Sequence, residues 1–128
     1  MKREIGTVLK NHEEIVFAYL FGSCARHEQL PQSDIDIAVY LTENTDPLAE
    51  KLSLLGDLSS HLQRDDIDIV IMNSAPLSLL GRIMAHRKVL LDRNPYVRHA
   101  FESLTIRKYL DFSIKEKALL ERRFGFGR

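Results

Sequence analysis

The feature that most constrains the fold of this chain is a pair of short segments in which aspartate alternates with apolar residues. The segments are DIDIAVYL, from Asp34 to Leu41, and DIDIVIM, from Asp66 to Met72. Successive side chains of a β-strand point to opposite faces of the sheet. Alternation with a period of two therefore predicts two similar strands, each with carboxylates on one face and isoleucine on the other.

Helices and further strands are expected around this pair. The apolar run IVFAYLFG, residues 15–22, predicts a buried strand, and KVLLD, residues 88–92, predicts a short last strand. Helical spacing predicts helices at residues 3–11, 47–59, 76–83 and 95 to about 123. The expected apolar positions are Leu48, Leu52, Leu55 and Leu58 on the second helix, and Val97, Phe101, Leu104 and Leu110 on the last. The fold class is therefore α/β (α+β), a small mixed β-sheet flanked by helices, and the long C-terminal helix is a candidate contact surface.

Composition excludes several classes of protein. The chain has 128 residues and 45% apolar content, which suits one domain with a packed core. Eighteen Lys and Arg balance eighteen Asp and Glu, so no basic field favours strong direct binding of nucleic acid. Cys24 is the only cysteine, which excludes an internal disulfide and fits a reducing compartment. Without a secretory h-region or an apolar run of roughly 18 residues, we expect a cytoplasmic protein that does not enter a membrane.

The residues with the clearest chemical meaning are Gly22-Ser23 and, ten residues later, Asp34-Ile35-Asp36. Carboxylates two positions apart on a strand point the same way from backbone positions roughly 6 to 7 Å apart, so they can converge on hard cations that prefer oxygen ligands. Ser23 and the backbone N–H groups of the turn that follows are suited to phosphate oxygens. The sequence thus predicts a phosphate-binding turn that faces a metal site.

A third carboxylate is expected from the second acidic strand. Asp65, Asp66 and Asp68 are all available there. Only Asp68 has isoleucine on both sides and lies well inside the strand, so it is the preferred residue.

The spacing of these residues resembles the GSX10DXD motif of the nucleotidyltransferase superfamily with the DNA polymerase β type palm. Within that superfamily the chain resembles the minimal nucleotidyltransferases, or MNT domains, which are small prokaryotic proteins usually paired with a HEPN-domain partner in toxin–antitoxin modules. The resemblance extends from Phe17 to about Asp92. It implies one nucleotidyltransferase domain over residues 1–128, with a palm-type sheet, a catalytic core at about 15–92 and a helical segment at about 94–123.

The resemblance also implies a role for each residue of the motif. Asp34 and Asp36 would ligate Mg²⁺ that bridges the phosphates of ATP, while Asp68 would help to place a second ion and activate the acceptor hydroxyl. Gly22 and Ser23 would hold the triphosphate. The implied reaction transfers AMP to a tyrosine of a HEPN ribonuclease toxin, which makes the chain a type VII antitoxin in a hetero-oligomer with that toxin.

Some residues near the motif have more than one interpretation. Arg26 either binds phosphate or pairs with an acid near the loop, since both uses suit a planar forked donor. His27 stands where the family often has glycine, and histidine tolerates a left-handed backbone better than most residues. Cys24 is interpreted as a small buried filler. The basic and aromatic tail, residues 121–128, docks on a partner, contacts RNA weakly or lies in solvent.

The five histidines are expected to be surface or hydrogen-bonded residues, because they lack the HxxxH or HExxH spacing of a helical zinc site. Two other functions remain open at this point. One is AMP transfer to a small molecule such as an aminoglycoside, which family members with extra acceptor domains perform. The other is a non-catalytic module that inhibits its partner through the C-terminal helix.

Overall fold

A four-stranded mixed sheet forms the centre of the protein. We describe a computed structural model for residues 2–22 and 34–124. The strands are β1 (Ile15–Phe21), β2 (Ile35–Leu41), β3 (Ile67–Ile71) and β4 (Lys88–Asp92), in the order β3-β2-β1-β4. β1 is antiparallel to both β2 and β4, whereas β2 and β3 are parallel. Parallel neighbours need a crossover connection, and α2 (Pro47–Leu62) supplies it.

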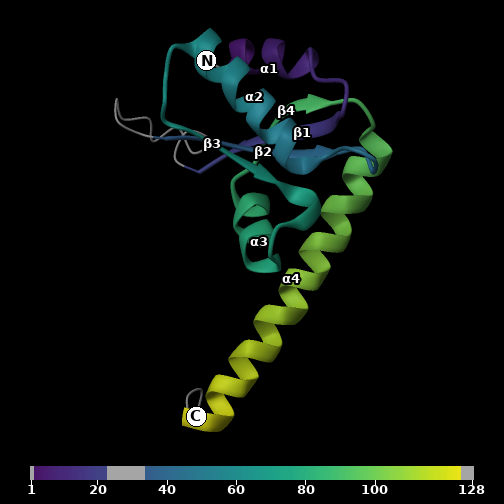
Figure 1. Ribbon diagram of the computed structural model, residues 1–128. Helices are drawn as coiled ribbons and strands as arrows, with labels where there is room; N and C mark the ends of the chain where they lie inside the picture. The colour runs from purple at the N-terminus through teal and green to yellow at the C-terminus, as the bar shows by residue number, and fades with distance from the viewer. Residues whose placement is uncertain (1, 23–33, 125–128) are drawn as a thin grey trace.

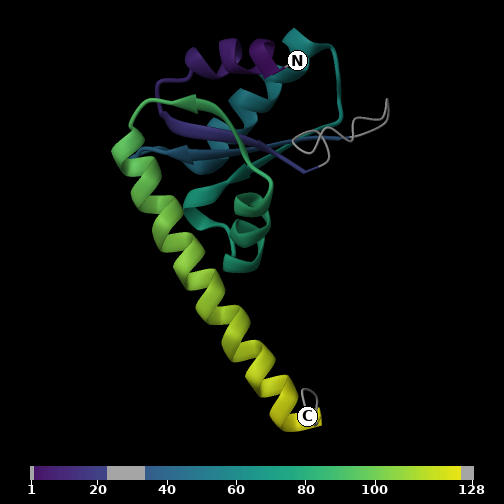
Figure 2. The same ribbon diagram turned by 180° about the vertical axis from the view of Figure 1, so that it is seen from behind.

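The helices lie on both faces of the sheet. Figures 1 and 2 show α1 (Lys2–Lys10) and α2 on one face and α3 (Leu77–Ala85) on the other, while α4 (Pro95–Phe124) runs past α3 and projects beyond the body. A short 3₁₀ turn, η1 (Met72–Ser74), follows β3 and was not predicted. The mixed sheet flanked by helices and the long C-terminal helix are confirmed. None of the helices in the described ranges has the length and apolarity that would let it cross a membrane.

The alternation of β2 divides the interior into two cores, as the sequence predicts. Ile35, Ile37, Val39 and Leu41 pack on the side of α1 and α2. Ala38 and Tyr40 pack on the opposite side with residues of α3 and α4. Asp36 precedes Ala38 by two positions, so its side chain emerges on the α3 side of the sheet.

The prediction of the apolar face of α2 is partly wrong. Leu48 and Leu52 are 66% and 59% exposed, whereas Leu54 and Leu58 are completely buried. Residues four apart lie on one helix face, and Leu54 and Leu58 form the row that the sheet covers. Asp46 caps the helix by accepting hydrogen bonds from the backbone N–H groups of Leu48 and Ala49.

The expected apolar stripe of α4 holds only for its first turns. Val97 and Phe101 pack on the sheet, but Leu104 and Leu110 are exposed, whereas Thr105 is buried and Tyr109 contacts Gly81 of α3. Residues four apart lie on one helix face, so the covered row continues from Phe101 through Thr105 to Tyr109.

A buried polar network fixes the first turns of α4 to the sheet instead. The Tyr19 hydroxyl donates to Glu102 at 2.5 Å, and Arg87 and Arg98 each donate to the same carboxylate oxygen at 3.0 Å. Burial, followed by the hydrogen bond to Glu102, raises the pKa of Tyr19, which keeps that hydroxyl protonated as the donor. The network therefore joins β1, α4 and the segment before β4.

The buried histidine of the described chain has a structural role. His12 follows α1, and its ring nitrogens lie 2.7 Å from Glu50 and 2.7 Å from Asp57 of α2. This bridge connects the end of α1 to α2. The expectation of a hydrogen-bonded histidine is thus confirmed at this position.

Candidate functional site

The candidate site is built at the point where three strand ends meet. In the parallel pairing of β2 and β3, Asp36 lies directly opposite Asp68, and on the other side of β2 it lies opposite Phe21 of β1. Adjacent strands are about 4.8 Å apart, so register alone makes Asp36 and Asp68 neighbours. Asp34 immediately precedes β2. The sheet therefore brings together the three acids that the sequence singled out.

The acids differ in their exposure to solvent. Asp36 is partly buried, while Asp34 and Asp68 are exposed. Burial first, and then the negative charges of Asp68 and Asp34, raise the pKa of Asp36, and the positive charge of Arg82 opposes that rise. Like charges held close together disfavour ionisation. A cation bound among them would relieve this repulsion.

Gly22 closes the site at the end of β1. Its φ is +75°, a left-handed conformation that glycine adopts without the steric cost paid by other residues. A Cβ placed on Gly22 would also collide with the Asp36 carboxylate. Both the backbone conformation and the position of the Asp36 carboxylate therefore favour glycine at this position.

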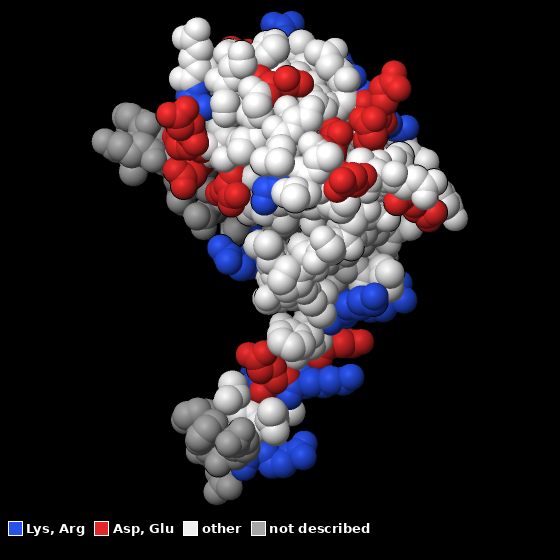
Figure 3. All heavy atoms as spheres, in the orientation of Figure 1, with Lys and Arg blue, Asp and Glu red and all other residues white. Residues whose placement is uncertain are grey.

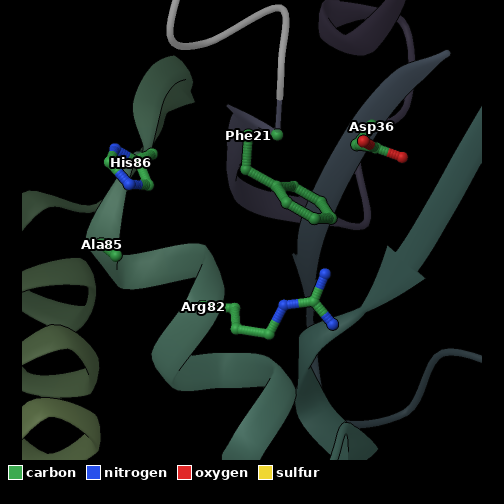
Figure 4. A pocket seen from close by; sticks show the side chains of 6 residues that line it. Phe21, Asp36, Arg82, Ala85 and His86 are labelled. Atoms are coloured by element: carbon green, nitrogen blue, oxygen red, sulfur yellow. The ribbon is translucent and has the colours of Figure 1, made fainter. Parts of the chain in front are cut away.

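A pocket of about 310 Å³ opens beside Gly22 and Asp36. Figure 4 shows Phe21 and Asp36 on the strands and the guanidinium of Arg82 extending into the pocket from α3. Ala85 and His86 complete the wall on the α3 side. The pocket thus combines a carboxylate from the sheet with a cation from a helix.

Arg82 was not singled out from the sequence. It lies in the last turn of α3, far from Asp36 in the sequence, and no motif or spacing relates the two.

The donor set suits a hard cation. Carboxylate oxygens are the ligands that Mg²⁺ prefers. Among the described residues, the strand ends at the site offer carboxylates, and the imidazole that lines the pocket, His86, lies on the α3 side. Within residues 2–22 and 34–124, no three His, Cys, Asp or Glu side chains already converge in metal-binding geometry. A cation bound among the carboxylates would offset their mutual repulsion.

The two other contenders for the third carboxylate have different surroundings. Asp66 pairs with Arg64, whose Nε donates at 2.8 Å and whose Nη2 makes a second contact. The hydrogen bond from Arg64 is the main cause of the lowered pKa of Asp66. Asp65 is exposed. Asp68 alone of these three occupies the register position opposite Asp36.

Several residues of the sequence analysis lie outside the described residues. These are Ser23, Cys24, Arg26, His27 and the end of the tail, residues 125–128. Their interpretations stay predictions. The rest of the phosphate-binding turn expected after Gly22 also falls outside the described residues.

Comparison with known proteins adds independent findings. A family model described as "Polymerase beta, Nucleotidyltransferase" matches residues 3–96. A Methanocaldococcus jannaschii protein, named for an inferred protein adenylyltransferase activity, is 31% identical over 106 residues, which cover 77% of this chain and 89% of the relative.

Solved structures agree over a longer stretch. A chain of a toxin–antitoxin complex with AMP-PNP has a TM-score of 0.78 and 28% identity, covering 94% of this chain and 96% of that one. A chain from the complex of tri-AMPylated Shewanella oneidensis HEPN toxin with MNT antitoxin has a TM-score of 0.71 and 26% identity, and the match covers 95% of this chain and 98% of that one.

Proposed function

This chain belongs to the polymerase beta nucleotidyltransferase family, and we propose that it transfers AMP from ATP to a hydroxyl of a HEPN-domain toxin, thereby acting as the antitoxin. The observation that carries the proposal is the in-register pair Asp36 and Asp68, with Asp34 beside them and Gly22 against the Asp36 carboxylate. The similarity to a protein adenylyltransferase supports the reaction type. The similarity to chains of complexes with AMP-PNP and with an AMPylated HEPN toxin supports the nucleotide and the acceptor.

We propose that Asp34, Asp36 and Asp68 hold Mg²⁺, with two ions at full occupancy. When bound, Mg²⁺ supplies positive charge at the attacking and leaving oxygens of the phosphoryl transfer. Clustered carboxylates on neighbouring strands are suited to this use. Burial and then the charges of Asp68 and Asp34 raise the pKa of Asp36, and a divalent cation would offset that repulsion between charges.

The nucleotide is expected to enter over Gly22. We propose that Gly22 and Ser23 approach the triphosphate with their backbone N–H groups and that Arg26 adds a side-chain contact. The absence of a side chain at Gly22 is consistent with a close approach of phosphate to the Asp36 carboxylate and its cation.

The proposed reaction joins the acceptor oxygen to the α-phosphorus of ATP. The bond from that phosphorus to the oxygen shared with the β-phosphate breaks, and pyrophosphate leaves. A tyrosine hydroxyl has an ordinary pKa of about 10, so its proton must be accepted by a base as the new bond forms. The exposed Asp68 carboxylate is the residue that we assign to this proton.

The acceptor protein must bind near the pocket, and α4 offers a surface for it. Exposed apolar side chains continue along this helix where it leaves the body: Leu104, Ile106, Leu110, Phe112 and Ile114. Figure 3 shows little charge over the region of α3, and Lys, Arg, Asp and Glu side chains along the part of α4 below it. Exposed apolar patches commonly mark protein interaction sites, and we propose that this one contributes to binding the toxin in the cytoplasm.

The proposal is tested by incubating the protein with ATP, Mg²⁺ and a HEPN-domain protein encoded beside it, and measuring the intact mass of the partner. We expect the partner to gain one or more AMP groups. The gain should disappear when Asp34 and Asp36 are both changed to alanine. A tight complex with an unmodified partner would instead support the non-catalytic alternative.

A further inference from the structure

Arg82 differs from the arginines that hold the fold together. Arg87 and Arg98 donate to Glu102, and Arg93 donates to backbone carbonyls of Lys10, His12 and Ile15. The Arg82 side chain, by contrast, is exposed and has no hydrogen bond or ion pair with any residue in the described ranges. A long cationic side chain in this state is available to bind a ligand.

The backbone of Arg82 is nevertheless held firmly. Its neighbours Gly81 and Ile83 are buried, and a Cβ on Gly81 would collide with the ring of Tyr109 on α4. The close contact of Gly81 with Tyr109 fixes α3 against α4. Arg82 therefore extends into the pocket from a helix that is packed against α4, and Figure 4 shows its side chain there.

The pocket concentrates negative charge near Arg82, which favours a cationic side chain at that position. Asp36 lines the pocket, and the negative charges of Asp34 and Asp68 act on it. A nucleoside triphosphate brings further negative charge into the same space. Among the described residues that line the pocket, Arg82 is the one with a permanent positive charge, because arginine stays protonated in proteins.

We propose that Arg82 binds the triphosphate of the nucleotide and remains bound to the pyrophosphate as it leaves. A guanidinium donates two parallel hydrogen bonds to phosphate oxygens, which makes it a strong and directional phosphate ligand. Without nucleotide, Arg82 partly neutralises Asp36. With nucleotide and cation bound, its charge is directed to the phosphates. This inference rests on the proposed function, and it adds a phosphate-binding residue from α3 that the motif does not contain.

The direct test is binding of AMP-PNP in the presence of Mg²⁺, measured by titration calorimetry on Arg82→Ala, Arg82→Lys and wild-type protein. Loss of a charge-assisted phosphate contact should weaken AMP-PNP binding roughly 10- to 100-fold in Arg82→Ala. Lysine keeps the positive charge but lacks the two parallel donors of a guanidinium, so Arg82→Lys should bind AMP-PNP more tightly than Arg82→Ala and more weakly than the wild type. Arg3→Ala is the matched control, because Arg3 is an exposed arginine of α1 on the opposite face of the sheet.

Kinetics of AMP transfer separate this role from contact with the acceptor. In Arg82→Ala the KM for ATP should rise and inhibition by added pyrophosphate should weaken, while the KM for the partner protein stays unchanged. A rise confined to the KM for the partner would overturn the proposal, and so would unchanged AMP-PNP binding. The melting temperature in the absence of nucleotide should match that of the wild type, which excludes misfolding.

The AMP-PNP measurement does not depend on the identity of the acceptor. If wild-type protein binds AMP-PNP and Mg²⁺ but leaves the HEPN partner unmodified, the proposed acceptor is wrong. The role of Arg82 is then still decided by the AMP-PNP affinities of the wild type and of Arg82→Ala. If Arg82→Ala binds AMP-PNP like the wild type while wild-type protein modifies the partner, the role of Arg82 is wrong and the proposed function stands.

Discussion

The backbone of Gly22 lies so close to the carboxylate of Asp36 that a Cβ at position 22 would collide with it unless the carboxylate moved. This contact joins the end of β1 to the acidic pair on β2 and β3. The expected phosphate-binding turn begins at Gly22, and the expected metal ligand is Asp36, so one steric relationship connects the two halves of the proposed site.

Gly22→Ala should damage the site more than the fold. The left-handed conformation costs a non-glycine residue about 1–2 kcal/mol, and the new methyl group must displace Asp36. A small misplacement of a reacting group can cost roughly 100-fold in rate, which is the loss that we expect in AMP transfer.

Gly56→Ala is the matched control for this change. Gly56 lies on α2, and a Cβ there would meet no atom within 4 Å. Alanine should raise the free energy of unfolding by about 0.5–1 kcal/mol through its better helix propensity and leave AMP transfer unchanged. Equal activity of Gly22→Ala and Gly56→Ala would contradict the assigned contact.

Mg²⁺ with ATP should stabilise the protein. A ligand that binds only the folded state at about a hundredfold excess over its dissociation constant adds about 2.7 kcal/mol. The melting temperature, measured by calorimetry, should rise on addition of Mg²⁺ and ATP and return to its starting value with EDTA. Asp36→Ala should show little of this rise. A melting temperature that saturating Mg²⁺ and ATP do not move would count against the site.

Glu102 should make stability depend on acid pH. Burial raises the pKa of Glu102, but hydrogen bonds from Tyr19, Arg87 and Arg98 outweigh it and hold that pKa below its ordinary value of 4.5. The folded state thus favours the ionised form. The resulting stability is present above pH 4.5 and is lost as the pH falls through the lower pKa of the folded protein.

Glu102→Gln tests this dependence. At pH 7 the substitution should lower the free energy of unfolding by about 1–3 kcal/mol, because hydrogen-bond donors in the network lose their charged acceptor. The gap between variant and wild type, measured by urea denaturation, should narrow as the pH is lowered below 4.5. A gap that is constant from neutral to acid pH would show that the charge of Glu102 does not stabilise the fold.

The orientation of α2 can be checked with two leucines. Leu54 is completely buried, so Leu54→Ala should cost about 2–5 kcal/mol in the free energy of unfolding. Leu48 is 66% exposed, and Leu48→Ala should stay within about 0.5 kcal/mol of the wild type. Chemical denaturation of both variants measures the difference, and equal losses would contradict the packing.

The strands β2 and β3 were well predicted from the sequence because alternation with a period of two matches the pleat of a strand and does not match the turn of a helix. The strands β1 and β4 were predicted from short apolar segments. Strand β4 was predicted at its observed bounds, and β2 and β3 to within one residue at each end. The two faces of β2 were also predicted, since each position of a strand belongs to one face or the other.

The helix faces were harder to predict. Leucine is so frequent on α2 that Leu48 and Leu52 fit a helical row as well as Leu54 and Leu58 do, and only packing against the sheet selects between the rows. On α4, Leu104 and Leu110 match the spacing of a buried stripe, yet α3 and the sheet cover the neighbouring row, in which Thr105 is buried and Tyr109 contacts Gly81.

The candidate site was predictable in part. The acids and Gly22 lie on the strands or at their ends, so the motif and its alternation were sufficient to select them. The pairing of Asp36 with Asp68 depends on sheet order and register, which local patterns do not encode. Arg82 reaches the pocket only because α3 folds back beneath the sheet, so no pattern near Asp36 could have revealed it.

The central claim is that Asp68, as a member of the acidic cluster, takes part in AMP transfer. The most direct measurement is the initial rate of AMP transfer to the HEPN partner by Asp68→Asn and by Asp65→Asn. Both changes remove one exposed carboxylate from the same short segment without changing its size, but only Asp68 lies opposite Asp36. We predict that Asp68→Asn loses nearly all activity while Asp65→Asn keeps the wild-type rate. Equal rates for the two variants would contradict the account.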